Sequence, residues 1–462
     1  MAAEPGMHEL SLWADDQRVA LLGYAPSDDR WTLHYMPDWI EREDAFPLSP
    51  PLPFASPLAS PFAAPGNGYA PGAIKRFVEN LLPEGRALDI SATTYRVPKA
   101  NIFGLIHALG AETAGAFRFW PADAVPPLTV AAPLRQVTVA ELNDRLNTRD
   151  EIPFVVWDGK VRMSIAGYQD KLLVYLDKPL AAGGRMFLVE PPLASTHILK
   201  PEPGRADMPH RVVNEHYCMS LARRMGLPVA DVDILRTPRP LLVVKRFDRI
   251  AVDGPDGPTV RRMHIIDACQ ASDLPLSCKY ERNLGNGEHV RDIRDGASFE
   301  RLFHRVDQTL NKAASRLEML RWALFQFLIG NSDAHGKNFS FFVGRQGLQP
   351  APWYDLVSVV QYPAIDQELA MAFGDAFTFA KVDAFALADF AKRCGIGKGV
   401  LRREAARLAK QVAEHAPLQA KADDYIGEER GFALQLRDFV TGQALRLNRL
   451  AAQAAGIKDE HL

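Results

Sequence analysis

The stretch IGNSDAHGKNFSFF, residues 329–342, places carboxylate, amide and ammonium side chains between two apolar flanks. Asp333 and Asn338 lie five positions apart, after an apolar segment with helical spacing, and the following chain predicts a hairpin whose return strand ends at Asp355. Phosphoryl transfer from ATP needs one carboxylate near an acceptor hydroxyl, and a second carboxylate with an amide oxygen to hold Mg²⁺. A solvated turn between two core elements would use the same residue types, so this stretch by itself leaves both interpretations open.

A kinase also needs a phosphate-binding lysine on a strand and an acidic residue on the next helix. Lys200 ends the apolar stretch THILK, and Glu215 lies in the helix predicted for VVNEHYCMSLA. Each also fits an ordinary surface position, at a strand end or on a solvated helix face.

Two further stretches suit a nucleotide. SIAGYQDK, residues 164–171, predicts a turn whose backbone amides could bind phosphate, although it is neither a Gly-rich kinase loop nor a Walker A motif. LLVVKRFDR predicts a strand whose end, from Lys245 to Phe247, could present main-chain groups to adenine. A plain β-turn and a core strand are the alternatives.

The elements that must hold these residues follow from the pattern of apolar positions. The N-terminal part predicts a hairpin over His8–Ala20, a Pro-rich loop, a helix over Ala73–Gly85, and a helix, turn and strand up to Pro121. Strands then dominate from Ile152, interrupted by one helix before Gly226. Helices dominate from about Ser298, including one over Arg316–Gly330 capped by Gly330.

This order predicts an α+β, two-lobed protein-kinase-like fold with a cleft, in which a β-rich N-terminal lobe with an extra N-terminal subdomain precedes a mostly helical C-terminal lobe. The expected domains are residues 7–122, 150–249 and 250–454.

Composition narrows the class of protein. Hydrophobic residues make up 47% of the 462 residues and charged residues 24%, and the formal net charge is -2, so no global field favours nucleic acid or an acidic membrane. No run is long and apolar enough to span a membrane, and the N-terminus lacks the features of a secretory signal. The four cysteines lack metal or redox spacing, which predicts reduced thiols and a cytoplasmic location.

Taken together, ordered stretches of this chain resemble the HipA family of serine/threonine-protein kinases, the toxin members of bacterial type II toxin–antitoxin systems. The matching stretches are SIAGYQDK, HILKPEP, NEHYCMSLARRMGLPV, VVKRFDR, HIIDACQASDLPLSCKYE, IGNSDAHGKNFSFF and PWYDLVS, with YMPDWI, PLSPPLPF, FVENLLPEG and GAETAGAFRFWP in the N-terminal part. The resemblance extends from about Met7 to about Leu450.

The resemblance implies a role for each matching position. Asp333 is the catalytic aspartate, Asn338 and Asp355 bind Mg²⁺, and Lys200 contacts the ATP phosphates. Ser164 is the autophosphorylated serine whose phosphate switches the kinase off. The expected nucleotide-binding residues also include Ile165, Ala166, Gly167, Tyr168, Gln169, Asp170, Lys171, Lys245, Phe247, His335 and Lys337, with Glu215 and Gln270 as supporting residues.

The resemblance also implies partners. The cofactors are ATP and Mg²⁺, the substrate is an aminoacyl-tRNA synthetase, glutamyl-tRNA synthetase above all, and a HipB-like helix-turn-helix antitoxin neutralises the toxin. DNA is reached indirectly, through the antitoxin, because the basic side chains of the C-terminal helices alternate with acidic ones. No membrane partner is expected.

Three positions depart from the family pattern: Asp170 replaces a common glutamate, Ile266 an acidic residue, and Lys245 a common hinge glutamate. None removes a residue needed for the chemistry. Two other functions are compatible with much of the same sequence. One is that of a non-catalytic corepressor that acts by binding the antitoxin, and the other is that of an unrelated ATP-dependent small-molecule kinase. Intact Asp333, Asn338, Asp355 and Lys200 argue against the first, and the match of the N-terminal part argues against the second.

Overall fold

The computed structural model describes residues 6–54, 68–127, 134–162, 167, 169–254 and 257–462. The chain divides into two compact units. Unit 1 comprises residues 1–201, 235–266 and 342–347, and unit 2 comprises residues 202–234, 267–341 and 348–462. The chain therefore passes five times from one unit to the other, after β10 and within β11, β15, β16 and β17.

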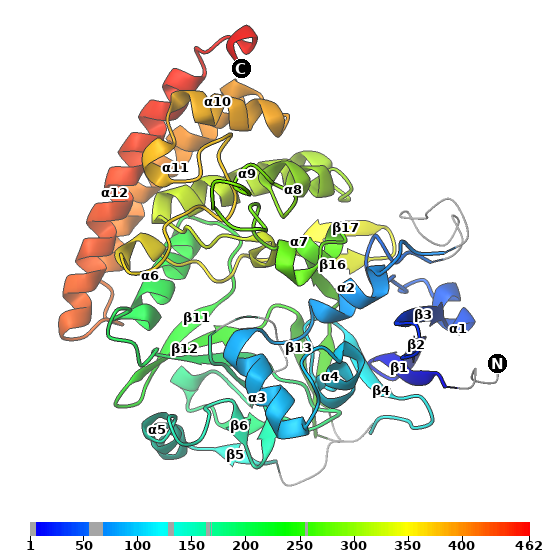
Figure 1. Cartoon of the computed structure of the whole chain (residues 1–462). Coiled ribbons are helices and arrows are strands. Elements are labelled where there is room, and N and C mark those ends of the chain that lie inside the picture. Colours follow the sequence, from blue (N-terminus) through cyan, green and yellow to red (C-terminus); the bar gives the residue numbers. More distant parts are fainter. Residues whose placement is uncertain (1–5, 55–67, 128–133, 163–166, 168, 255–256) are drawn as a thin grey trace. The chain divides into compact units, whose positions relative to one another are not determined.

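Unit 1 begins with an antiparallel four-stranded sheet of order β3-β2-β1-β4 (Figure 1). Leu10 pairs with Leu22, and Leu12 with Phe119, and all four side chains are buried. The elements of this part are β1 (His8–Ala14), β2 (Gln17–Ala25), β3 (Arg30–Tyr35), α1 (Pro37–Glu41), α2 (Ala73–Glu79), α3 (Gly85–Tyr95), α4 (Ile102–Leu109) and β4 (Phe117–Pro121).

The second sheet of unit 1 has six strands in the order β11-β12-β10-β8-β9-β5. Its core contains Leu172, Val174, Leu199 and Val243, and α5 packs on it through Leu142 and Leu146. The elements are β5 (Gln136–Val137), α5 (Val139–Asn147), β6 (Val156–Trp157), β7 (Lys160–Val161), β8 (Leu172–Leu176), β9 (Met186–Leu188), β10 (His197–Pro201), β11 (Val232–Arg236), β12 (Pro240–Lys245), β13 (Arg249–Gly254), β14 (Gly257–Arg262) and β15 (Ile265–Asp267).

Unit 2 is mostly helical. Its central helix α9 buries residues on every side, including Trp322, Phe325 and Leu328, as expected for a helix surrounded by others. Helices α11 and α12 run side by side (Figure 1). The elements are α6 (Arg211–Arg224), α7 (Ala268–Ala271), α8 (Phe299–Val306), α9 (Lys312–Ile329), β16 (Ser340–Gly344), β17 (Gly347–Pro350), α10 (Ala384–Arg393), α11 (Lys398–Ala420) and α12 (Glu428–Ala454).

Most expected elements are confirmed, among them the N-terminal hairpin, the helix before Gly226 and the helix that Gly330 caps in the left-handed conformation. Some boundaries are wrong, among them the start of the helix expected at Arg316, which begins at Lys312. The helix expected over Ala73–Gly85 ends at Glu79, where the Asn80 side chain donates to the Arg76 carbonyl, and Gly85 instead begins α3. The return strand expected to end at Asp355 ends at Pro350, because prolines at 350 and 352 cannot donate to a ladder.

All four cysteines are free thiols, three of them buried and Cys278 half-buried. Within the described ranges, none of the helices combines the length and the apolar character that crossing a bilayer demands.

Candidate active site

The loop that follows α9 is fixed by hydrogen bonds from its first residue onward. Asn331 donates from its side chain to Gln326 Oε1 at 2.9 Å, and its Oδ1 accepts the backbone N–H of Asp333 at 3.2 Å. The Ser332 carbonyl accepts from the Ala370 N–H at 2.7 Å. Asp333 is therefore held by main-chain and side-chain bonds on its N-terminal side.

Asp333 is the exposed residue of this loop, whereas every other residue from Asn331 to Ser340 is buried. Its carbonyl accepts the backbone N–H of His335 at 2.9 Å and the side-chain amide of Asn338 at 3.3 Å. With four residues between them, Asp333 and Asn338 thus close a turn in which the Asn338 side chain donates through its amide nitrogen. A consequence is that its amide oxygen remains available for another partner.

Lys337 and Gln270 meet at Asp267, a residue to which the sequence assigned no function. Lys337 Nζ lies 2.8 Å from Asp267 Oδ2, and both side chains are largely buried. Asp267 also caps α7, in a capping box completed by Gln270. The ion pair of Lys337 with Asp267 thus joins α7 to the loop of residues 331–338, called the catalytic loop below after the role that the family resemblance gives Asp333, while Gln270 completes the cap of α7 itself.

The hairpin β16–β17 is joined to the same loop by Tyr354. Its hydroxyl donates to the Lys337 carbonyl at 2.5 Å and lies 2.7 Å from Ser340 Oγ. Burial raises the pKa of the Tyr354 hydroxyl well above its ordinary value, so this hydroxyl remains a donor. Asp355 follows directly, with a φ of 57° that aspartate adopts more readily than most residues.

Helix α6 contributes Arg211 and Glu215, which form an ion pair of 3.3 Å one turn apart. Burial opposes the charge of Arg211, but the nearby carboxylates of Glu215, Asp355 and Asp333 outweigh it and raise its pKa. A positive charge therefore lies close to both aspartates to which the family resemblance assigns the chemistry. Glu202 accepts the backbone N–H groups of Arg211 and Val212 at 2.7 and 2.9 Å and so caps the start of α6.

Unit 1 contains the remaining residues that are expected to bind the nucleotide. Lys171 and Lys200 are both buried, and Gln169 donates to the Pro201 carbonyl at 3.4 Å. A Cβ added at Gly167 would collide with Lys171 Nζ, which places this ammonium directly beside the backbone of the turn. Burial raises the pKa of Asp170. Ser164, Ile165, Ala166 and Tyr168 lie outside the described residues.

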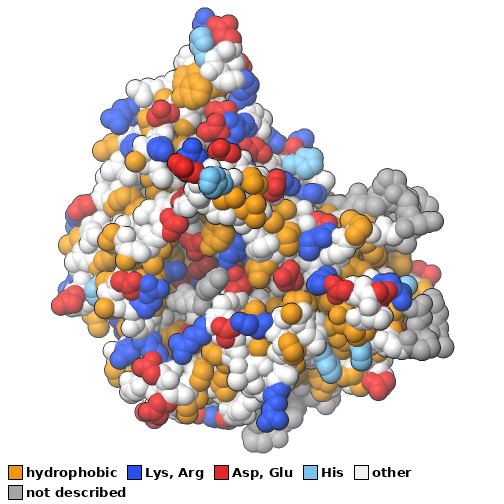
Figure 2. Space-filling view, in the orientation of Figure 1, with side chains coloured by type: hydrophobic (Ala, Val, Ile, Leu, Met, Phe, Trp, Pro, Cys, Tyr) orange, Lys and Arg blue, Asp and Glu red, His pale blue; other side chains and the backbone are white. Residues whose placement is uncertain are grey.

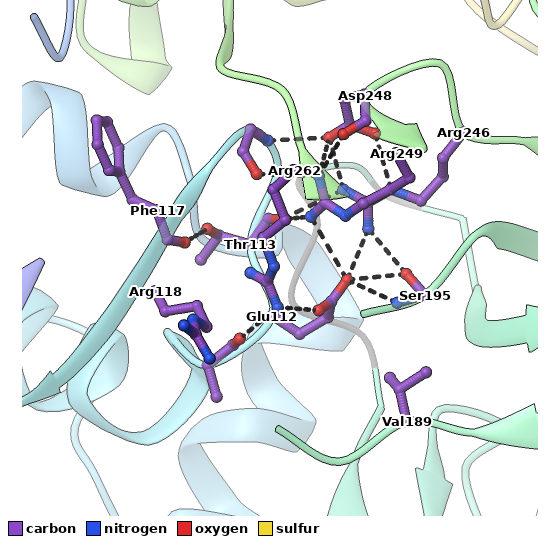
Figure 3. Close-up of polar contacts among 12 residues, drawn as sticks. Glu112, Thr113, Phe117, Arg118, Val189, Ser195, Arg246, Asp248, Arg249 and Arg262 are labelled. Atoms are coloured by element: carbon purple, nitrogen blue, oxygen red, sulfur yellow. Dashed lines mark hydrogen bonds and ion pairs between the residues drawn. The ribbon is translucent and has the colours of Figure 1, made fainter. Parts of the chain in front are cut away.

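The chain from Lys245, the last residue of β12, to Asp248 alternates between more exposed and buried side chains. Lys245 is exposed and Phe247 half-buried, while Arg246 and Asp248 point into the interior. Figure 3 shows the buried cluster that holds them: Arg246 bonds Asp248 at 2.7 and 2.9 Å, Ser195 at 2.9 Å and Glu112 at 3.0 Å.

Two more arginines complete this arginine cluster. Arg262 lies 2.6 Å from Glu112, and Arg249 lies 2.7 Å from Asp248 and donates to the Thr113 carbonyl at 2.7 Å (Figure 3). Although burial opposes its charge, these guanidinium groups lower the pKa of Glu112. The turn around residues 111–115, in the N-terminal part of the chain, is thereby tied to the backbone that carries Lys245 and Phe247.

The donor set fits Mg²⁺. This ion takes one or two protein oxygens and completes its shell with water and substrate phosphates. Asn338 offers an amide oxygen, Asp355 offers a carboxylate, and both belong to unit 2. No group of three or more histidine, cysteine or acidic side chains gathers as a metal cage among the residues that the structure describes.

Sequence reasoning missed Tyr280, whose hydroxyl donates to Asp333 Oδ1 at 2.9 Å, as well as Arg211, Asn214 and Asp267. Tyr280 lies in the stretch SCKYE that carries part of the family resemblance. Local spacing holds no signal for the contacts that these residues make with Asp333, Asp355, Ser358 and Lys337, because those partners lie far away along the chain.

Comparison with known proteins identifies the family. The model of the HipA N-terminal domain matches residues 10–120, and that of the HipA-like C-terminal domain matches residues 163–420. The protein named serine/threonine-protein kinase toxin HipA from Shewanella oneidensis is 39% identical over 406 residues, which cover 88% of each chain.

A solved structure agrees. In the complex of the Shewanella oneidensis toxin–antitoxin system with HipA, HipB and its operator DNA, one chain matches this one with a TM-score of 0.84 at 36% identity, covering 97% of this chain and 100% of that chain. The expected α+β, kinase-like fold is thereby confirmed. With both family domains matched and a relative of this identity spanning most of the chain, the protein belongs to the HipA family of serine/threonine-protein kinases.

Proposed function

We propose that this chain is an ATP- and Mg²⁺-dependent protein kinase in which Asp333 takes the proton of a serine or threonine hydroxyl. Asn338 and Asp355 hold Mg²⁺, and Lys200 contacts the phosphates together with the turn at 165–171. The main chain from Lys245 to Phe247 binds adenine. Mg²⁺ supplies charge neutralisation on the phosphates, and the protein supplies position and water exclusion.

The observation that carries this proposal is the geometry of the catalytic loop. Asp333 is the exposed residue of an otherwise buried loop, and Asn338 is bonded to the Asp333 carbonyl through its amide nitrogen. A base must reach a substrate hydroxyl, whereas a metal ligand must present an oxygen, and this arrangement leaves each group available for its proposed part. Arg211 compensates part of the negative charge of Asp333 and Asp355.

The proposed regulation is autophosphorylation of Ser164. A phosphate adds nearly two negative charges beside a phosphate-binding turn, so it repels ATP and favours displacement of the turn. The proposed cellular role is that of a cytoplasmic toxin that phosphorylates an aminoacyl-tRNA synthetase, glutamyl-tRNA synthetase first, and arrests growth. A HipB-like helix-turn-helix antitoxin neutralises it, a partner supported by the HipB chain in the solved Shewanella complex.

Contact with DNA is proposed to be indirect. Figure 2 shows basic and acidic side chains interspersed over the face drawn. On the C-terminal helices, Arg407 is paired with Glu404, and Arg446 donates to the carbonyls of Phe379 and Val382. These arginines are engaged within the protein, so the isolated chain is expected to bind an operator duplex weakly even at low salt, where phosphate contacts are strongest.

Radiolabelled ATP tests the kinase proposal. The purified chain is expected to label itself and a mixture of aminoacyl-tRNA synthetases with their tRNAs. Asp333→Asn should abolish both signals, and Asp438→Asn, on the exposed side of α12, should keep them. Equal labelling by Asp333→Asn would remove Asp333 from the chemistry.

Phosphosite mapping of the intact chain tests the proposed switch, because Ser164→Ala should abolish the autophosphorylation site while activity toward the synthetase persists. Growth arrest that survives Asp355→Ala would instead favour a non-catalytic role.

A further inference from the structure

Tyr280 lies on a segment held on both sides by main-chain hydrogen bonds. The Lys279 carbonyl accepts the N–H of Gly336, in the catalytic loop, at 2.9 Å. The Glu281 N–H donates to the Ala370 carbonyl at 2.9 Å, and the Cys278 carbonyl accepts from Ala297 at 2.8 Å. The backbone on either side of Tyr280 is therefore fixed, one bond going directly to the loop that carries Asp333.

Side chains reinforce this placement. The buried Glu281 accepts the Ala372 N–H at 2.8 Å and forms an ion pair with Arg294. A Cβ added at Gly296 would overlap the Tyr280 carbonyl oxygen, so a residue without a side chain is required at this close approach.

The Tyr280 side chain packs on the catalytic loop. Its ring meets the His335 ring edge-to-face at a centroid distance of 5.3 Å, and Lys279 Nζ lies 5.3 Å from its centroid. Its hydroxyl donates to Asp333 Oδ1 at 2.9 Å. The aromatic contact and the hydrogen bond together set the position of the hydroxyl relative to the aspartate.

The two oxygens of the Asp333 carboxylate are thereby made unequal. Oδ1 accepts the Tyr280 hydroxyl, while Oδ2 accepts no hydrogen bond from the part of the chain that the structure describes. A carboxylate that removes a proton from a substrate hydroxyl needs one oxygen aimed at that hydroxyl and a side chain that does not rotate away.

We propose that Tyr280 is a positioning residue for Asp333, whose hydroxyl fixes the carboxylate so that Oδ2 faces the acceptor hydroxyl. This inference rests on the proposed function, in which Asp333 is the base. In the transfer, the acceptor oxygen bonds to the γ-phosphorus, the bond from that phosphorus to the bridging oxygen breaks with its electron pair leaving on ADP, and the hydroxyl proton passes to Oδ2. Tyr280 keeps its own proton throughout.

The same contact also fits a second role for Tyr280, that of a gate. In this role the Tyr280 hydroxyl occupies the position of the substrate hydroxyl beside Asp333 and blocks it. The packing favours positioning, because the neighbouring backbone is bonded to the catalytic loop and the ring lies on His335 of that loop. The two roles predict opposite effects when the hydroxyl is removed, since loss of a gate raises the rate and loss of a positioning contact lowers it.

The test uses Tyr280→Phe, which keeps the ring and removes the hydroxyl, beside Tyr69→Phe, which removes a hydroxyl bonded to the Pro53 carbonyl in the N-terminal part of the chain. Mg²⁺-dependent ATP hydrolysis and self-labelling from radiolabelled ATP are measured, so that neither assay depends on the identity of the protein substrate. Calorimetry with ADP and thermal unfolding accompany both assays.

For Tyr280→Phe, kcat should fall about tenfold while the KM for ATP stays within about twofold, because a hydrogen bond to a charged group is lost and nucleotide contacts are kept. ADP affinity and melting temperature should match the wild type, and Tyr69→Phe should keep the wild-type kcat. Incorporation of 3-fluorotyrosine at position 280 restores a hydroxyl donor and should restore kcat, which also guards against a Phe variant that folds poorly.

An unchanged or raised kcat in Tyr280→Phe, with Asp333→Asn inactive, would overturn the positioning role and leave the proposed function standing. So would a loss of ADP affinity or melting temperature that parallels the loss of rate, or a fluorotyrosine protein as slow as the Phe variant. Full activity of Asp333→Asn would remove the proposed function itself.

Discussion

Asn214 on α6 and Ser358 exchange two hydrogen bonds across 144 positions of the chain: the Ser358 N–H donates to Asn214 Oδ1 at 2.8 Å, and the Asn214 amide donates to the Ser358 carbonyl at 3.0 Å. The same amide lies 3.1 Å from the Tyr362 hydroxyl. Asn214 and Ser358 are fully buried. The segment that follows Asp355 is therefore anchored to α6, the helix that also carries Arg211 and Glu215.

Replacing Asn214 by Leu should destabilise the protein by about 2 to 4 kcal/mol, because two buried main-chain groups of Ser358 lose their partners. Urea unfolding measures this loss. Asn448→Leu, on an exposed position of α12, is the control and should stay within about 0.5 kcal/mol of the wild type. Equal stability of the two variants would mean that water replaces Asn214 without loss.

Asp267 combines a helix cap with a buried ion pair, and two variants separate these contributions. Asp267→Asn keeps a good capping residue, whereas Asp267→Ala removes the cap as well, so the alanine variant should be less stable by about 1 kcal/mol. Both remove the carboxylate of the buried ion pair between Asp267 and Lys337, which should destabilise each by about 3 kcal/mol. Denaturant midpoints compared at constant m-value check the order, and an alanine variant as stable as the asparagine variant would contradict the capping contribution.

Glu112 is expected to control both stability and the backbone that carries Lys245. Glu112→Gln removes the carboxylate that lies 2.6 Å from Arg262 and one of the two carboxylates paired with Arg246, the other being Asp248, and should destabilise the protein by about 3 kcal/mol. Because the pKa of Glu112 is lowered on folding, its contribution is complete above the unfolded value of about 4.3 and is lost as pH falls below it. The stability difference between wild type and variant should therefore shrink in acid.

Calorimetry with ADP extends this test to the proposed adenine contact. Weaker ADP binding by Glu112→Gln is expected if main-chain groups at Lys245 and Phe247 hold the base. Unchanged ADP affinity in a destabilised variant would separate the arginine cluster from nucleotide binding. The exposed Glu460→Gln variant is the control for both measurements.

The raised pKa of Glu281 should give the stability of the protein the opposite dependence on pH. Burial raises its pKa to about 7, although the Ala372 N–H and Arg294 act in the other direction. Between about 4.3 and 7 the unfolded chain releases this proton while the folded chain keeps it, so stability falls by up to about 3 kcal/mol as pH rises across this interval and changes no further above it. Glu281→Gln removes this titration, and its stability relative to wild type should therefore increase from pH 4.3 to 7. Parallel curves for the two proteins would contradict the raised pKa.

The elements around the catalytic loop could be predicted because their signals are local. The apolar spacing of α9, the glycine that caps it and the two-strand pattern after Asn338 each extend over a few residues, and the structure has all three. The prediction that the return strand ends at Asp355 was wrong for a local reason as well, because the prolines at 350 and 352 end the strand pairing. The family could likewise be predicted from the sequence, because stretches that match it occur in order along nearly the whole chain.

By itself, then, the sequence determined the order of elements, the family, and the placing of Asp333 and Asn338 on one turn after a buried helix. Tertiary structure alone decided what surrounds them. Tyr280 reaches Asp333 across 53 positions, Lys337 reaches Asp267 across 70, and Asn214 reaches Ser358 across 144. Such pairs form when packing brings distant segments together, and no spacing within either segment encodes the partner, so the contacts that orient the chemical groups become visible in the folded chain.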